Sequence, residues 1–243
     1  MSTATVDDEP VLGGQWAAAN KDRLYHLIAQ QCLRRYPPLR DRADLARQLA
    51  AGLVQKLRGD FTFSLNFRPR FLAALIWEGF LPICCELDAG LWVMLPKLHA
   101  QRSTLALEHL HVGKQVRKRS RRYSLTVNKA WDAVVMGCVA QHGENWLYPP
   151  MRQALGALHR HHRDGARTPD SADPASRVRM VSVELWREPE EEEEEKGQGG
   201  AGGAASGSPR NKRRQLVAGE IGSVCGRVYT SFTGFRRESE RGA

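Results

Sequence analysis

One short stretch of the chain combines cationic side chains at a spacing that suits phosphate binding. In LHVGKQVRKRSRRYSLTV, residues 110–127, five of them fall at i, i+3, i+4, i+7 and i+8: Lys114, Arg117, Lys118, Arg121 and Arg122. A helix with this spacing carries all five charges on one face. A solvated helix face is the alternative, but six basic residues among nine favour a nucleic-acid contact.

The charge of the whole chain also indicates a polyanionic partner. Its 243 residues have a formal net charge of +9, and the segment EPEEEEEE at 188–195 contributes seven carboxylates. Without that segment, 36 Lys and Arg stand against 20 Asp and Glu, a balance of +16. Nucleic acid is the first candidate for so basic a chain, and simple solubilising charge is the alternative.

The remaining reactive side chains do not predict metal or disulfide chemistry. The five cysteines, including Cys84 and Cys85, have neither metal-ligand nor disulfide spacing and are expected to be reduced thiols. His159, His161 and His162 have no accompanying Cys or Asp, so we expect them on a helix surface and predict no metal site. No membrane span is expected, because no run of eighteen apolar residues occurs. The N-terminal residues MSTATVDDEP are acidic and lack an apolar core, so we expect neither a secretory signal nor a membrane partner.

Helical patterns dominate the first part of the chain. Asn20 is a predicted N-cap for a helix that carries Leu24, Leu27 and Ile28 on one face and ends before Pro37. A second helix is expected over residues 42–58, because leucines recur every four residues and Gly59 follows. A third is expected from Pro69 to Gly79, and residues 91–95 form a short strand candidate.

The second half of the chain predicts a sheet with flanking helices. Residues 123–127 alternate as a strand does, and Asn128 is a candidate cap for a helix that buries Trp131. Another helix is expected over about 151–163. The Gly-, Ser- and Glu-rich residues 188–214 separate two strand-like stretches, so we expect a disordered insertion in a hairpin loop.

Several of these stretches together resemble one family. LHVGKQVRKRSRRYSLTVNKAWDAVVMGCVAQHGENWLYPPM, VSVELWRE and LVAGEIGSVCGRVYTSFTGF are similar, in this order, to the leucyl/phenylalanyl-tRNA–protein transferases in their divergent eukaryotic form. NFRPRFLAALIWEGFLPI resembles the segment that opens the family's substrate side, so the resemblance covers about residues 60–235. It implies an α/β fold of the α+β type, in which a helical N-terminal region precedes a GCN5-related acetyltransferase-like domain with a mixed sheet.

The resemblance also implies an activity. Family members move leucine or phenylalanine from aminoacyl-tRNA to the N-terminal α-amine of a protein that begins with Arg or Lys, which marks the product as an N-degron for degradation. The ester to tRNA is already activated, so positioning supplies most of the rate and no cofactor or metal is implied. We therefore expect a cytoplasmic monomer with two partners, aminoacyl-tRNA and the acceptor protein.

Site residues follow from the resemblance position by position. Trp146, with Tyr148 and Glu144 as neighbours, matches the pocket for the 3′-terminal adenosine and its aminoacyl group, where a ring can stack on a base. A core tryptophan is the alternative. Glu184 matches the acceptor side, and a strand glutamate that faces solvent is the alternative. No catalytic residue is assigned. Six basic residues match the helix that contacts tRNA phosphates: Lys114, Arg117, Lys118, Arg119, Arg121 and Arg122.

Two departures from the family pattern concern activity. Ile83 in GFLPI stands where bacterial members have a tryptophan, and Phe232 in SFTGF stands where the family has a glutamate implicated in the active site. A phenyl ring cannot act as a base. Two interpretations therefore stay open, an aminoacyltransferase and a non-catalytic relative that binds tRNA or a protein. An acetyl-CoA-dependent enzyme is disfavoured, because no phosphate-cradling glycine loop opens a helix.

The resemblance divides the chain into segments. We expect a helical extension of unassigned role at 1–59, a substrate-side segment at 60–112, the acetyltransferase-like domain at 113–235 and a polar tail at 236–243. Residues 216–235 predict two strands joined by a tight turn, which in the family are followed by further helices and a strand. The domain is therefore expected to be truncated, with an uncovered sheet edge and an exposed apolar face, and cover by a partner chain is the alternative.

Overall fold

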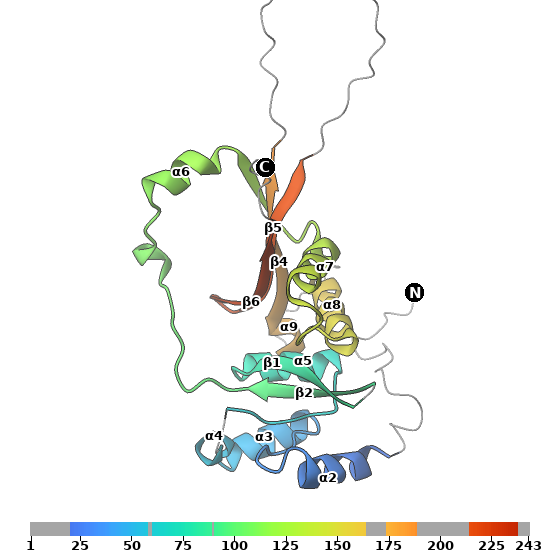
Figure 1. Ribbon diagram of the computed structural model, residues 1–243. Coiled ribbons are helices and arrows are strands. Elements are labelled where there is room, and N and C mark those ends of the chain that lie inside the picture. The colour runs from blue at the N-terminus through green and yellow to red at the C-terminus, as the bar shows by residue number, and fades with distance from the viewer. Residues whose placement is uncertain (1–19, 58–59, 89, 164–173, 189–213, 238–243) are drawn as a thin grey trace, which may run out of the picture.

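Two antiparallel sheets and the helices around them form an α+β protein, which confirms the predicted fold class (Figure 1). The computed structural model describes residues 20–57, 60–88, 90–163, 174–188 and 214–237. Every strand pair in these ranges is antiparallel, so a parallel strand of a mixed sheet does not occur among the described residues.

Three short helices gather at one end of the molecule (Figure 1): α2 (Lys21–Gln31), α3 (Arg42–Ala50) and α4 (Leu53–Lys56). A single helix over 42–58 was the expectation, and it is wrong because Gly52 interrupts it. Gly52 has φ +80°, a left-handed conformation that glycine adopts without steric cost and that ends one helix before the next begins.

Helix α2 is held by Tyr25 rather than by the predicted leucines. Tyr25 and Ile28 are its buried residues, whereas Leu27 is 37% exposed. The Tyr25 hydroxyl donates to the Leu39 carbonyl at 3.2 Å and accepts from the Leu65 amide at 2.9 Å. A buried hydroxyl with both partners satisfied stabilises the helix on the segment that leads into the first sheet.

The first sheet pairs β1 (Leu81–Asp88) with β2 (Leu91–Lys97), and α5 (Pro69–Trp77) precedes it. Pro69 is the first residue of α5 and Gly79 follows the helix with φ +89°, as the sequence predicts. The predicted strand at 91–95 is confirmed as part of β2, and β1 is an additional element.

The larger sheet has the strand order β3-β4-β5-β6, with β3 at Tyr123–Val127, β4 at Val178–Arg187, β5 at Gln215–Cys225 and β6 at Val228–Arg236. β5 and β6 are joined by a tight turn in which Gly226 has φ +58°, so the predicted strand pair is confirmed. β4 and β5 pair antiparallel as the predicted hairpin, while the low-complexity residues 189–213 between them lie outside the described residues.

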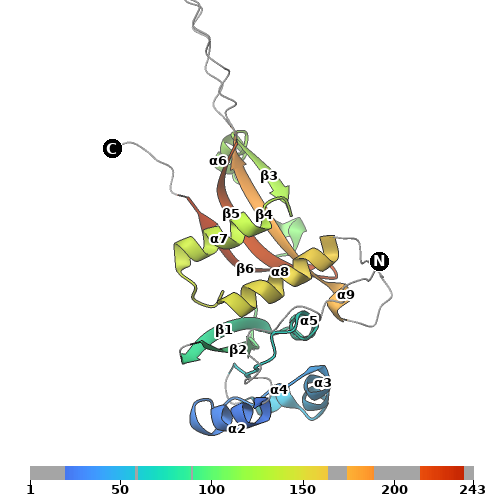
Figure 2. The same ribbon diagram turned by 90° about the vertical axis from the view of Figure 1, so that its right-hand side faces the viewer.

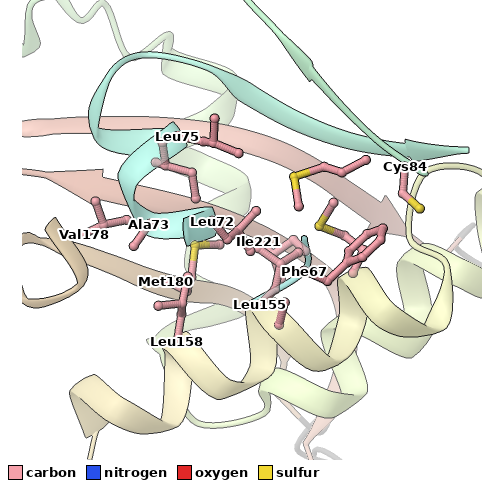
Figure 3. Close-up of a cluster of buried hydrophobic side chains, with 14 of the residues drawn as sticks. Phe67, Leu72, Ala73, Leu75, Cys84, Leu155, Leu158, Val178, Met180 and Ile221 are labelled. Carbon is pink, nitrogen blue, oxygen red and sulfur yellow. The ribbon is translucent and has the colours of Figure 1, made fainter. Parts of the chain in front are cut away.

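Helices α7 (Trp131–His142) and α8 (Pro149–Arg163) cover one face of this sheet, with the short α9 (Pro174–Arg177) leading into β4 (Figure 2). Their apolar side chains meet those of α5 in one cluster, in which Leu72, Leu155 and Ile221 are fully buried (Figure 3). Core residues from both sides of the expected boundaries at 59/60 and 112/113 belong to this cluster, so those boundaries stay predictions.

The other face of the larger sheet carries exposed aliphatic side chains. Leu125 is 64% exposed and Val127 is 48% exposed, and they pair across the sheet with Leu185 and Val183. Leu125 and Val127 alternate with Thr126, which faces α7, because successive strand residues point to opposite sides. Leu125 and Val127 thus form an exposed apolar patch on β3.

Candidate functional site

The basic stretch forms a short, protruding helix. Helix α6 (Lys114–Ser120) follows an extended segment that contains a 3-10 turn, η1 (Leu107–His109), and it lies away from the body of the molecule (Figure 1). It is shorter than predicted, because Arg121 ends the helix and Arg122 lies in the turn before β3. All six predicted basic residues are exposed, and none has an ion-pair partner among the described residues.

A turn between α7 and α8 fixes the position of Trp146. Gly143 has φ +74°, and Asn145 has φ +43°, which is uncommon for a residue with a side chain. The Leu147 amide donates to the Glu144 carbonyl at 2.6 Å and closes the turn. Sequence reasoning selected Trp146 and Glu144 but not the Gly and Asn that shape this turn, although HGEN carries a recognisable turn composition.

This turn borders a pocket of about 180 Å³. Trp146 and Glu144 line it, together with Cys138 and His142 at the end of α7 and Thr233 on β6. Tyr148 does not line this pocket; it lies at the start of α8 and packs against the main core. The structure thus brings two of the three predicted pocket residues to one cavity and adds residues that no sequence pattern marked.

Phe232 lies beside Trp146, one of the residues that line the pocket. The two ring centroids are 6.2 Å apart at an interplanar angle of 74°, an edge-to-face contact. The residue that stands in place of the family glutamate therefore packs on the predicted stacking residue. The Glu144 carboxylate is 3.0 Å from Arg152 Nη1, so this acid is held in an ion pair.

Cys138 presents a thiol rather than a thiolate to the pocket. Burial raises the pKa of Cys138 to about 11, because the charged form loses its hydration, and a hydrogen bond with Thr233 only partly offsets this. The nucleophilic form of cysteine is the thiolate. The pocket therefore offers Cys138 as an apolar wall and not as a nucleophile at neutral pH.

Glu184 lies on β4 with its side chain directed at the start of α7. It is 0% exposed, so the alternative of a solvent-facing strand glutamate is wrong. Its carboxylate accepts from Ser182 Oγ at 2.6 Å, from the Thr126 hydroxyl, and from the backbone amides of Lys129 and Ala130 at 3.2 and 3.1 Å. A carboxylate at this position satisfies amides that a helix N-terminus leaves unpaired and interacts favourably with the helix dipole.

Asn128 does not cap α7 in the predicted way. It has φ +58°, its amide donates to the Ser182 carbonyl and its side-chain oxygen accepts from the Ser182 amide, both at 3.0 Å. Asn128 therefore continues the pairing of β3 with β4 by one residue, and Glu184 takes the capping position from a neighbouring strand. An intersegment contact of this kind leaves no local signal in the sequence.

The predicted histidine surface is wrong for one of its three members. His159 is 3% exposed, its Nδ1 lies 3.1 Å from the Met180 carbonyl oxygen, and its ring stacks on Trp131 at 4.3 Å. It is a core residue that ties α8 to α7 and β4. Within the described ranges, no group of three or more His, Cys, Asp or Glu side chains is placed to hold a metal ion.

Comparison with known proteins addresses the family. Residues 104–190 match the family model described as leucyl/phenylalanyl-tRNA protein transferase. No curated protein matches the chain in sequence. Among the described residues, no helix has the length and apolar character needed to cross a membrane. The matched range contains α6, β3, α7, α8 and β4, and with them the Trp146 turn and Glu184. Residues 104–190 of the chain are therefore similar to the leucyl/phenylalanyl-tRNA protein transferase family.

Proposed function

We propose that this chain transfers leucine or phenylalanine from aminoacyl-tRNA to the N-terminal α-amine of an acceptor protein. The observation that carries this proposal is the family match at 104–190, since one matched segment contains both the unpaired cations of α6 and every lining residue of the pocket beside Trp146 except Thr233. We propose cytoplasmic N-degron tagging as the setting of the reaction. The preference for an acceptor that begins with Arg or Lys rests on the resemblance alone.

In this proposal α6 binds the phosphates of tRNA. Its exposed cations have no carboxylate partner among the described residues, so phosphate binding breaks no internal ion pair. Such contacts give affinity and orient the tRNA but carry little sequence information. The identity of the aminoacyl group is then read at the 3′ end and not along the helix.

The pocket beside Trp146 is the proposed site of the aminoacyl side chain. At about 180 Å³ it is smaller than the roughly 300–1,000 Å³ of typical ligand sites, so it suits one amino-acid side chain better than a whole nucleoside. The apolar edges of Trp146 and Leu147 favour an apolar side chain such as leucine or phenylalanine. The terminal adenosine then lies outside the pocket, where the exposed part of Trp146 can stack on the base.

The reaction needs positioning more than it needs an activated group. The α-amine nitrogen attacks the ester carbonyl carbon, a C–N bond forms, the C–O bond to the ribose breaks, and the ribose oxygen takes up the proton that the amine releases. No oxidant or reductant takes part. We assign Glu184 a positioning role here, because its buried carboxylate fixes the start of α7, the helix that carries Cys138 and His142 to the pocket.

A transfer assay tests the proposal. The full chain is incubated with leucyl- or phenylalanyl-tRNA and a peptide that begins with Arg, and the expected result is a peptide heavier by one leucyl or phenylalanyl residue. Uncharged tRNA and a peptide with an acetylated N-terminus serve as controls. Trp146→Ala is expected to reduce transfer by about 5- to 150-fold through lost stacking of about 1–3 kcal/mol, with Trp77→Ala, an exposed tryptophan outside the pocket, as the matched control.

A non-catalytic tRNA binder is the second candidate, and the Phe232–Trp146 contact favours it. If the chain shows salt-dependent tRNA binding but no peptide gains mass, the enzyme proposal fails and the binder stands. Phe232→Glu then asks whether the missing carboxylate is the cause. If only this variant transfers the aminoacyl group, the missing carboxylate at position 232 explains why the unmodified chain is inactive. If the variant is inactive as well, the cause lies at another position.

A further inference from the structure

The N-terminal helices enclose a second, larger hollow that the proposed transfer site does not use. This pocket has a volume of about 900 Å³ and lies between the end of α2, the Pro37-Pro38 segment and α4. Arg34, Arg35 and Lys56 are among its lining residues, Tyr36 contributes an aromatic wall, and none of the described residues that line it is a carboxylate. Its volume falls within the roughly 300–1,000 Å³ of known ligand sites.

Within the part of the chain that the structure describes, the three cations of this pocket have no carboxylate partner. Residues 20–60 contain nine Lys and Arg and four Asp. Three of the carboxylates are paired with other cations: Asp22 with Arg40 at 2.9 Å, Asp44 with Arg47 at 2.5 Å, and Asp60 with Lys97 at 3.9 Å. The fourth, Asp41, caps α3 through the Asp44 amide. Arg34, Arg35 and Lys56 therefore face the pocket without an ion-pair partner among the described residues.

The walls of the pocket are fixed in place by contacts with each other and with Phe61 and Phe63. The Leu39 amide donates to the Phe63 carbonyl at 2.8 Å, and the Phe63 amide donates to the Pro37 carbonyl at 3.1 Å. Gln48 Nε2 donates to the Pro38 carbonyl at 2.7 Å, and the Tyr36 ring packs on Phe61 at 5.5 Å. A preformed wall costs little ordering entropy on binding, and this favours a ligand site over a transient hollow.

We propose that this pocket binds a phosphate-bearing nucleotide unit of tRNA, at a second contact remote from α6. Arginine pairs offer the planar donors that phosphate oxygens accept, and an aromatic ring beside them can stack on a base. Helices α2 and α4, which border the pocket, lie at the opposite end of the molecule from α6 (Figure 1), so an extended polyanion can contact both. The choice of tRNA rests on the proposed function, whereas the anion-binding character rests on the pocket alone.

The test is tRNA binding by the full chain, measured over a range of salt concentrations. The variant Arg34→Glu/Arg35→Glu removes two pocket cations, and Arg23→Glu/Arg227→Glu makes the same charge change at exposed positions outside the pocket. Two lost phosphate contacts should lower the slope of log K against log salt by roughly two and weaken binding about tenfold or more at low salt. The control pair should leave the slope within about half a unit of the unmodified chain, since distant charges are screened.

A second measurement locates the ligand directly. Acetylation of lysines by a soluble reagent is followed by mass spectrometry, with and without tRNA. Protection of Lys56 but not of Lys21, which lies on α2 outside the pocket lining, supports the proposal. Equal effects of the two double variants together with an unprotected Lys56 would overturn it. Protection by ATP or inorganic phosphate but not by tRNA would also overturn it, since the site would then serve a small anion.

Failure here is separable from failure of the proposed function. If reversal of the α6 charges abolishes tRNA binding while the pocket variants bind tRNA normally, the proposed transfer function is retained. The proposal of a second tRNA contact at the pocket is then rejected. If no variant and no unmodified chain binds tRNA at any salt concentration, both proposals fall. Circular dichroism of each variant confirms that the helices are intact, because Arg34 also donates to the Gln30 carbonyl near the end of α2.

Discussion

The carboxylate of Glu184 accepts a hydrogen bond from the backbone amide of Ala130 over 3.1 Å, although 54 residues separate them in the chain. This contact joins the centre of β4 to the start of α7. The Thr126 hydroxyl, which also donates to Glu184, accepts from Trp186 Nε1 at 2.8 Å, so β3 and β4 share the same network. One buried acid thereby sets the position of the helix that carries Cys138 to the pocket.

Removal of the Glu184 carboxylate should destabilise the fold. Glu184→Ala leaves the buried Ser182 hydroxyl and the partly buried amides of Lys129 and Ala130 without this acceptor, and we expect a loss of about 2–4 kcal/mol in the free energy of unfolding. Glu184→Gln keeps one acceptor oxygen and should lose less. Urea unfolding followed by tryptophan fluorescence measures both, with the exposed Glu108→Ala as control. Equal stability of all three variants would show that the network contributes nothing.

Charge reversal on α6 should weaken tRNA binding without loss of stability. Lys118, Arg121 and Arg122 are exposed and unpaired among the described residues, so their replacement by Glu disturbs no internal contact. Three lost phosphate contacts should reduce the slope of log K against log salt by about 2–3. Filter binding at several salt concentrations provides the slope, and Arg179→Glu on β4 provides a single-charge comparison. If the slopes do not change, α6 is a solvated helix face and does not contact tRNA phosphates.

The Cys138 thiol should react slowly and with a steep dependence on pH. Its pKa of about 11 means that the thiolate is scarce at pH 7 and grows about tenfold for each pH unit until the pKa is approached. Alkylation by iodoacetamide, followed by mass spectrometry, should therefore be far slower at Cys138 than at the exposed Cys32. Rapid alkylation of Cys138 at pH 7 would contradict its burial. Cys138→Ser should retain transfer, because the proposed chemistry needs no thiolate.

A methyl group at Gly222 should disturb the hairpin of β5 and β6. A Cβ there would lie 2.5 Å from the Thr230 carbonyl oxygen and 2.6 Å from the Tyr229 ring, closer than atoms in contact approach. Because the carbonyl belongs to the paired strand, relief requires the strands to separate, and Gly222→Ala should cost about 1–3 kcal/mol. Gly113→Ala, where nothing lies within 4 Å, is the matched control. Thermal unfolding of the two variants checks the difference.

Local patterns in the sequence were sufficient for most of the elements. The limits of α5 follow from Pro69 and Gly79, and the turn of β5 and β6 follows from Gly226, because backbone preferences at these positions depend only on neighbouring residues. The basic composition of α6 is equally a property of the sequence. The division of residues 42–58 into two helices was missed, although Gly52 carried the signal.

Only part of the candidate site could be predicted from the sequence. Trp146 and Glu144 were selected through a resemblance, and they line the pocket, but Cys138 and Thr233 reach it from α7 and β6. Those two residues lie far apart along the chain. The periodicity of a local sequence does not predict that the end of a helix contacts a distant strand. The cations of the N-terminal pocket were not predicted as binding residues either, because the sequence does not show that the neighbouring carboxylates pair with other cations.

The sequence by itself determined the kinds of residue available, the helices and strands that bear them, and the excess of positive charge. The tertiary structure alone decided which charges are neutralised and which polar groups are buried. Glu184 shows the reason most plainly: on an isolated strand its carboxylate would prefer water, and burial becomes favourable only when the register of β3, β4 and α7 brings its donors together.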